Sequence, residues 1–292
     1  MNQNLQSILE DSISYFDEIR AFKFSLDKID ISRASEKKIF ENLQAAITAS
    51  SISFPYSKDF KKNSLEENKQ LAISFFESFL GENTGTPLTT IPIEKASMPM
   101  FDGATLFSYN LQEKTITPIK IVLYRTDLSY NALSLCHENT HILFNNHMPT
   151  PGFHYHYNEL LPILIELIAT TYFSELLNEK KLLDLYLTIR TKTLQDHIAE
   201  YKSCEKLLKM GPIKEIELPI KYSMNTCYTY IISTIFAFHL FEQYQKYPDE
   251  IRAIIKECLM HHIKVEDMLR KRDISLKNPD TVNATMKVLQ KK

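Results

Sequence analysis

The feature that most constrains the fold of this chain is an HExxH run at residues 137–141, inside an otherwise apolar segment at residues 133–144. Two residues four positions apart in a helix lie on the same face, with Cβ atoms about 5–6 Å apart. His137 and His141 so placed can both reach one zinc ion at about 2.0–2.1 Å. Glu138, one step round the helix, can act as general base on a water molecule bound to that metal. The run therefore predicts a helix that carries two zinc ligands and a catalytic base.

The residues around the run leave this helix almost no polar face: Leu133, Leu135, Cys136, Ile142, Leu143 and Phe144. A helix that is apolar all round should be buried. Buried histidine and glutamate side chains need partners, because an unpaired polar group in the interior costs free energy. A metal ion would be such a partner. The alternative is a buried helix whose histidines are satisfied by other side chains.

Composition narrows the class of protein. A chain of 292 residues can form one large domain or two closely packed ones. Its 34 basic and 36 acidic residues give a net charge of −2, which does not favour nucleic-acid binding. Glycine is scarce, at 5 residues, and tryptophan is absent, which fits a helical protein and disfavours glycine-rich phosphate loops.

Cysteine spacing and hydropathy indicate the compartment. The 4 cysteines show no paired or metal-type spacing, so we expect reduced thiols. The N-terminus has early acidic residues and no basic start before an apolar core, so no Sec signal peptide is expected. No uncharged apolar run is long enough to span a membrane. These features predict a cytoplasmic protein, although a secreted toxin or effector without a signal peptide stays open.

Apolar periodicity predicts helices along most of the chain. Before the HExxH run we expect helices over residues 1–27, 32–50 and 64–80. Ser64 and Glu67 form a capping box at the start of the third. After the run we expect helices over residues 158–177, 180–210, 224–247, 248–263 and the last part of the tail. The first three should form an antiparallel helical layer, an N-terminal segment of residues 1–95 packed on a catalytic domain of residues 96–292.

A small β element precedes the HExxH helix. Residues 105–111 and 116–124 alternate or are β-branched, and a short polar turn at 112–114 joins them, which predicts a β-hairpin. The fold class is therefore mainly α with a small antiparallel β element. An edge strand beside a metal-binding helix could align a peptide by strand addition. The alternative is a hairpin that only covers the core.

A catalytic zinc with two histidines needs a third protein ligand and one open position. Glu166 lies 25 residues after His141 and mid-helix among apolar residues, where a lone carboxylate would be costly unless paired or metal-bound. Glu159 lies at or before the first helical turn, where the helix dipole already accounts for a carboxylate. We therefore favour Glu166 as the third ligand over Glu159.

The loop at residues 145–157 contains His147, His154 and His156. These are further candidates for metal ligation, but histidines among aromatic neighbours in a loop more often contact substrate or are simply exposed. We expect His154 and His156 to contact substrate.

From about residue 100 to its end, the chain resembles the thimet oligopeptidase and oligoendopeptidase F family of zinc peptidases. The residues that carry the resemblance are the HExxH run, the stretch Glu166-Leu167-Ile168-Ala169 and the tyrosine-rich segment at residues 228–250. Thr140 and Phe144 depart from the family's HExGHxxH pattern, and Cys227 stands where many relatives have tyrosine. The chain is also roughly half the family's usual length.

The resemblance implies a multi-helix gluzincin-like zinc peptidase fold with one Zn²⁺ per chain. His137, His141 and Glu166 would ligate the zinc, and Glu138 would be the general base. Tyr230 would stabilise the transition state, and Tyr228 is a candidate for substrate contact. The expected activity is hydrolysis of peptide bonds in oligopeptides or in a flexible segment of a protein. Two alternatives are a non-catalytic peptide- or protein-binding module on a peptidase scaffold and a zinc hydrolase of a non-peptide amide.

Overall fold

The structure is a computed structural model, and it describes residues 34–49, 60–95, 103–110, 115–124, 128–145, 157–179, 181–209, 214–261 and 263–290. The predicted helix over residues 1–27 and the loop with His147, His154 and His156 lie outside the described residues.

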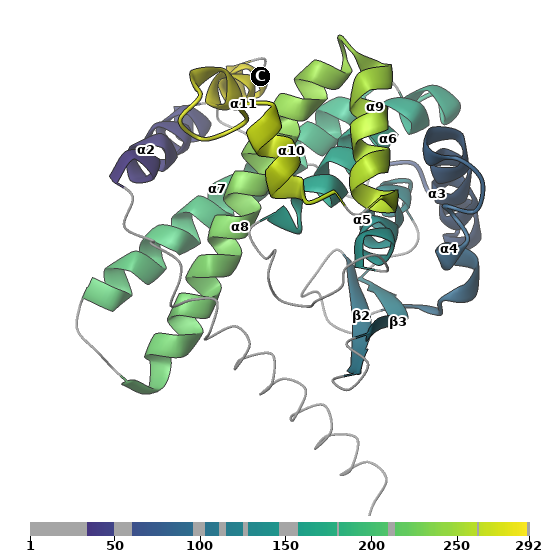
Figure 1. Cartoon of the computed structure of the whole chain (residues 1–292), viewed down its shortest axis with the longest axis horizontal. Coiled ribbons are helices and arrows are strands. Elements are labelled where there is room, and N and C mark those ends of the chain that lie inside the picture. The colour runs from purple at the N-terminus through teal and green to yellow at the C-terminus, as the bar shows by residue number, and fades with distance from the viewer. Residues whose placement is uncertain are drawn as a thin grey trace, which may run out of the picture.

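The described part is mainly helical with one small sheet (Figure 1). Before the HExxH helix come α2 (Ala34–Ala49), α3 (Leu65–Leu80), α4 (Pro87–Thr90), β1 (Ile93–Lys95), β2 (Gly103–Asn110) and β3 (Thr115–Leu123). The HExxH helix is α5 (Tyr130–Asn145), and after it come α6 (Leu160–Leu176), α7 (Leu182–Lys209), α8 (Lys214–Tyr244), α9 (Pro248–Met260), α10 (Val265–Lys271) and α11 (Pro279–Gln290). The mainly α class with a small β element is confirmed.

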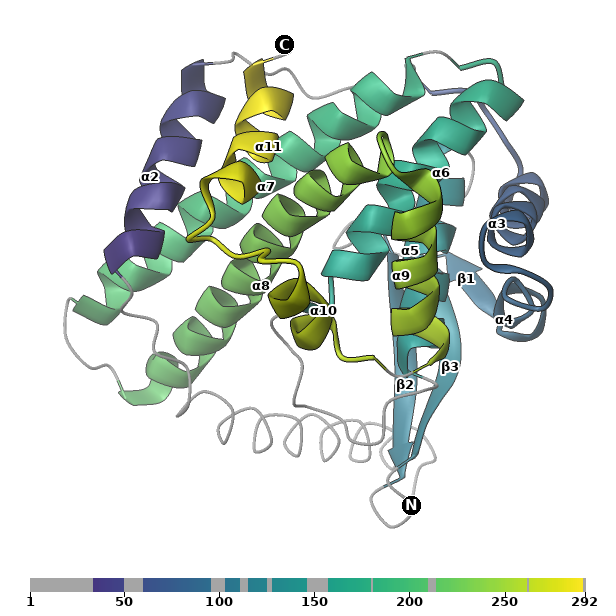
Figure 2. The ribbon, with the colours of Figure 1, turned by 45° about the horizontal axis from the view of Figure 1, so that its top comes forward.

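The helices before the sheet do not form a layer together. Helix α3 has the predicted capping box between Ser64 and Glu67, and it packs against α5. Helix α2 packs against α7 and α11, on the opposite side of the molecule (Figures 1 and 2). For α2 and α3 the expectation of one helical layer is wrong, because their apolar faces are buried against different later helices. Both contribute to a single hydrophobic core that extends from Phe40 to Ile274.

The sheet has three strands in the order β1-β3-β2. Strands β2 and β3 form the predicted antiparallel hairpin, with Gly103 opposite Leu123. Strand β1 pairs in parallel with β3, with Ile93 opposite Ile121, and the sequence did not predict it. Among the described strands β2 has one neighbour only, so its other side is a sheet edge.

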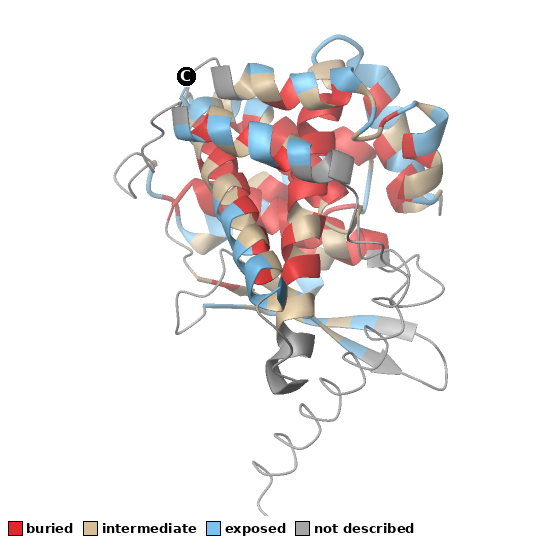
Figure 3. Cartoon of the chain, turned by 90° about the vertical axis from the view of Figure 1, so that its left-hand side faces the viewer, coloured by how far each residue is buried: buried red, intermediate tan, exposed pale blue. Residues whose placement is uncertain are grey.

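Helix α5 lies in the middle of the molecule. It packs against α3, α6 and α9 and against the sheet. Its apolar residues Leu133, Leu135, Cys136 and Ile142 are fully buried, as expected for a helix that is apolar all round. Figure 3 shows that buried residues gather where the helices face one another.

Two long helices, α7 and α8, run side by side and pack along much of their length (Figures 1 and 2). Helix α8 begins ten residues earlier than predicted, at Lys214. Helix α6 lies between α5 and this pair and contacts all three. In the part of the chain that the structure describes, no helix combines the length and the hydropathy that a membrane crossing requires.

Candidate metal centre and active site

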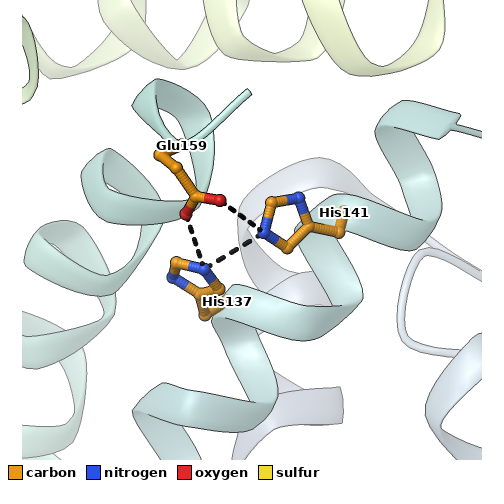
Figure 4. Close-up of side chains that lie close together, drawn as sticks. All are labelled: His137, His141 and Glu159. Atoms are coloured by element: carbon orange, nitrogen blue, oxygen red, sulfur yellow. Dashed lines mark hydrogen bonds and ion pairs between the residues drawn. The ribbon is translucent and has the colours of Figure 1, made fainter. Parts of the chain in front are cut away.

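The two histidines of the HExxH run point at the same carboxylate (Figure 4). Nε2 of His137 lies 3.1 Å from Nε2 of His141 and 3.1 Å from Oε2 of Glu159. Nε2 of His141 lies 3.6 Å from Oε1 of Glu159. Two imidazole nitrogens and a carboxylate that converge in this way are the donor set of a three-ligand zinc site.

Local geometry explains the convergence. His137 and His141 are four residues apart on α5 and therefore share one face. Glu159 is the N-cap residue of α6, and its side chain makes no capping hydrogen bond. Its carboxylate is therefore free to reach across to α5, against which α6 packs.

Glu166 faces the other nitrogen of His137. Its Oε2 lies 3.2 Å from Nδ1 of His137, whereas the convergent nitrogens of the two histidines are both Nε2. This oxygen also accepts hydrogen bonds from the hydroxyl of Tyr186, at 2.5 Å, and from the guanidinium of Arg190. The structure thus places the Glu159 carboxylate at the two Nε2 atoms and the Glu166 carboxylate at Nδ1 of His137.

Tyr186 and Arg190 stabilise the buried carboxylate of Glu166 by donating hydrogen bonds to it. Tyr186 is fully buried, Arg190 is 8% exposed and Glu166 is 1% exposed. Nε of Arg190 donates to the Tyr186 hydroxyl at 2.6 Å, so the three side chains form one network. A buried carboxylate needs a partner, and a cation from α7 provides it. Sequence reasoning missed this network; its one signal is a charged residue, Arg190, on the apolar side of α7.

The carboxylates of Glu159 and Glu166 dominate the electrostatics around His137. Burial lowers the pKa of His137, but the charges of Glu166 and Glu159 outweigh burial and raise it to about 10. Burial raises the pKa of Glu159, and the charges of His141 and His137 outweigh it and bring that pKa well below its usual value. Oε2 of Glu159 is buried, and Nε2 of His137 lies 3.1 Å from it. A divalent cation between the two histidines and Glu159 would compensate this charge, so the donor set fits zinc.

The carboxylate of Glu138 lies against Gly103 and Thr105 of strand β2. The hydroxyl of Thr105 donates to Oε2 of Glu138 at 2.8 Å. A Cβ on Gly103 would lie 3.0 Å from Oε1 of Glu138 and 2.9 Å from the Leu123 side chain. The absence of a side chain at Gly103 therefore leaves room for Oε1, while Thr105 holds Oε2. Glu138 is 4% exposed.

We expect Thr105→Val to lower kcat roughly tenfold or more, because a hydrogen bond to a charged group contributes about 1.5–3 kcal/mol. Valine keeps the shape and removes only the hydroxyl that orients Glu138. Zinc content should stay unchanged. The matched control is Thr117→Val on β3, an exposed position in the same hairpin. Equal kcat values for the two variants would contradict a positioning role for Thr105.

Tyr230 of α8 lies at the same centre. The negative charge of Glu159, burial and a hydrogen bond to Glu159 together raise the pKa of its phenol well above the usual value. Its ring stacks on His197 of α7, with ring centroids 4.6 Å apart and planes 11° apart.

Tyr228 lies elsewhere, although the sequence suggested a substrate contact. Its ring packs against Phe40 of α2 and Tyr201 of α7, at centroid distances of 6.1 Å and 6.3 Å. The reason is helical geometry, since residues two apart point about 200° apart round the helix axis. His154 and His156, the other candidates for substrate contact, lie outside the described residues.

Comparison with known proteins supports the fold assignment. No family model matches the chain. No curated protein matches it in sequence. Two solved structures share its fold: a protein named as a peptidase from Chlamydophila abortus, at 13% identity and a TM-score of 0.54, and one named as an oligoendopeptidase F from Bacillus anthracis, at 10% identity and a TM-score of 0.61. They cover 87% and 91% of this chain, which spans 54% and 57% of theirs. The chain therefore shares the fold of these two structures and spans a little over half the length of either.

Proposed function

We propose that the chain is a zinc-dependent endopeptidase in which His137, His141 and Glu159 hold one Zn²⁺. The observation that carries the proposal is the convergence of the two Nε2 atoms on the Glu159 carboxylate, with Glu138 beside them on the same helix. The shared fold with two proteins named as peptidases supports the reaction class. Zinc at such a site polarises a scissile carbonyl and makes water a better nucleophile near neutral pH.

The side chains around the centre would transfer the proton and hold the reacting groups in position. Glu138 takes a proton from the attacking water and passes it to the leaving amine. Thr105 holds Oε2 of Glu138, so that Oε1 remains for the water. Glu166 faces Nδ1 of His137 and fixes the orientation of its ring, with Tyr186 and Arg190 holding Glu166 in turn.

The sheet offers a place for the substrate. Strand β2 is an edge strand among the described strands, and its Thr105 contacts the proposed base. An extended peptide that pairs with this edge would run past Glu138 and bring a backbone carbonyl to the centre. We therefore propose a peptide, or a flexible segment of a protein, as the substrate.

The proposed activity is tested by incubating the full chain with a diverse peptide library, with and without a chelator, and identifying products by mass spectrometry. We expect cleavage of internal peptide bonds that the chelator abolishes and added zinc restores. Cleavage that survives the chelator would contradict zinc dependence. No cleavage of any peptide would favour a binding module on a peptidase scaffold.

The ligand assignment gives a separate prediction. Glu159→Ala should lose one equivalent of zinc relative to the wild type, because it removes one of three ligands. Glu166→Gln should keep this zinc but bind it about 10–100-fold more weakly, the usual effect of losing a partner of a ligating histidine. Elemental analysis measures the zinc content, and competition with a chelator measures the affinity.

Glu94→Gln is the control for both variants, because Glu94 is an exposed carboxylate on β1 that pairs with Lys120. It should leave zinc content and affinity unchanged. Zinc retained by Glu159→Ala and lost from Glu166→Gln would reverse the assignment.

A further inference from the structure

A second group of metal-ligating side chains lies between α7 and α8. His197 and Glu200 come from α7, three residues apart, and Cys227 comes from α8. Each offers one ligand atom, and these atoms all lie within 4.8 Å of one another. None of the three belongs to the donor set of His137, His141 and Glu159.

The chemistry of these side chains fits zinc. Thiolate, imidazole and carboxylate are the donors that zinc takes in proteins, and bond lengths of about 2.0–2.3 Å set their separations at roughly 3.3–3.6 Å. From separations of up to 4.8 Å, the ligand atoms would therefore close by up to about 1.2–1.5 Å, which side-chain rotations can provide. Softer donors such as thiolate disfavour calcium and magnesium, which prefer oxygen.

Two of these donors already interact with each other and with a neighbour: Cys227 hydrogen-bonds to Glu200, and the Ser223 hydroxyl donates to Oε1 of Glu200. Nδ1 of His197 is buried and makes no hydrogen bond within the described residues. Burial lowers the pKa of His197, against the charge of Glu200, which raises it. Burial and the charge of Glu200 raise the pKa of Cys227 to about 12, so without a cation the thiol keeps its proton. Zinc would displace the proton of the Cys227 thiol and compensate the negative charges of the thiolate and of Glu200.

We propose that His197, Glu200 and Cys227 form a second zinc site that ties α7 to α8. The exposed Glu200 lets the metal enter from solvent, and the buried Cys227 anchors it. The ring of His197 stacks on Tyr230, so a metal that fixes His197 also fixes one wall of the proposed active site.

Zinc stoichiometry tests the proposal. The full chain, equilibrated with zinc-buffered solution, should bind two equivalents. Glu200→Gln and Cys227→Ser should each bind one, as should His141→Ala, which loses the other site. The double variant His141→Ala/Cys227→Ser should bind none. Asp196→Asn is the control and should bind two equivalents. Asp196 is an exposed carboxylate on α7, one helical turn before Glu200.

Cobalt(II) gives a readout specific to this site, because only a sulfur ligand produces the near-ultraviolet thiolate-to-cobalt charge-transfer band. The wild type and Cys258→Ser, a buried cysteine of α9, should show the band. Cys227→Ser should lose it, and Glu200→Gln should weaken or lose it. One zinc equivalent in both the wild type and Cys227→Ser, or a band that persists in Cys227→Ser, would overturn the second site. A peptidase test that fails while two equivalents bind would instead count against the proposed function alone.

Discussion

Glu138→Gln should keep its zinc and lower the rate of peptide cleavage by at least about 100-fold, the usual scale for a lost general base. Glutamine has nearly the same size as glutamate and can still accept the Thr105 hydroxyl, which lies 2.8 Å from Oε2 of Glu138. It cannot take a proton from water. The change therefore removes the proposed chemistry and leaves the proposed ligands His137, His141 and Glu159 in place.

Steady-state kinetics on a cleaved peptide measures this effect, and elemental analysis of the same preparation shows that the zinc is bound. Glu94→Gln on β1 is again the control, since it makes the same substitution at an exposed position of the sheet that packs against α5. A zinc-loaded Glu138→Gln protein that cleaves at nearly the wild-type rate would exclude Glu138 as the base.

Local patterns predicted the scaffold of the site well. The HExxH spacing, the apolar segment around it and the hairpin before it are properties of short stretches of sequence, and α5, β2 and β3 lie where those patterns predict. The capping box of α3 is equally local, since Ser64 and Glu67 satisfy each other's backbone groups. These elements need no knowledge of what packs against them.

The choice between Glu159 and Glu166 could not be made in this way. The two residues are seven apart, or about two helical turns, so they lie on nearly the same face of α6. The argument for Glu166 was that a carboxylate buried mid-helix needs a cation. That argument holds, but the partner in the structure is Arg190, 24 residues further along the chain. A non-local partner of this kind leaves no periodic signal.

The small elements were missed for a similar reason. Strand β1 has three residues, and its place beside β3 comes from a parallel pairing between segments almost thirty residues apart. Helices α4 and α10, with four and seven residues, are too short to show apolar periodicity. The positions of α2 and α3 on opposite sides of the core likewise depend on contacts with α5, α7 and α11.

Tyr230→Phe should lower kcat by about 10²–10³-fold, or roughly 2.7–4 kcal/mol, and leave KM and zinc content little changed. A carbonyl under attack by water gains negative charge on its oxygen. A phenol held on a rigid helix can donate to that oxygen without reorganising during the reaction. Tyr230 meets this requirement, because it lies at the Glu159 carboxylate and its ring is held against His197.

The substitution separates chemistry from packing. Phenylalanine keeps the ring that stacks on His197, at a centroid distance of 4.6 Å, and removes only the hydroxyl. If Tyr230 serves only the core, kcat should barely move and the free energy of unfolding should fall by about 1 kcal/mol, the usual contribution of one hydrogen bond. Tyr228→Phe is the matched control two residues earlier on α8, where the ring packs against Phe40 and Tyr201. A larger loss of kcat in Tyr228→Phe than in Tyr230→Phe would refute the role of Tyr230, because it would move the oxygen-stabilising donor to the opposite face of α8.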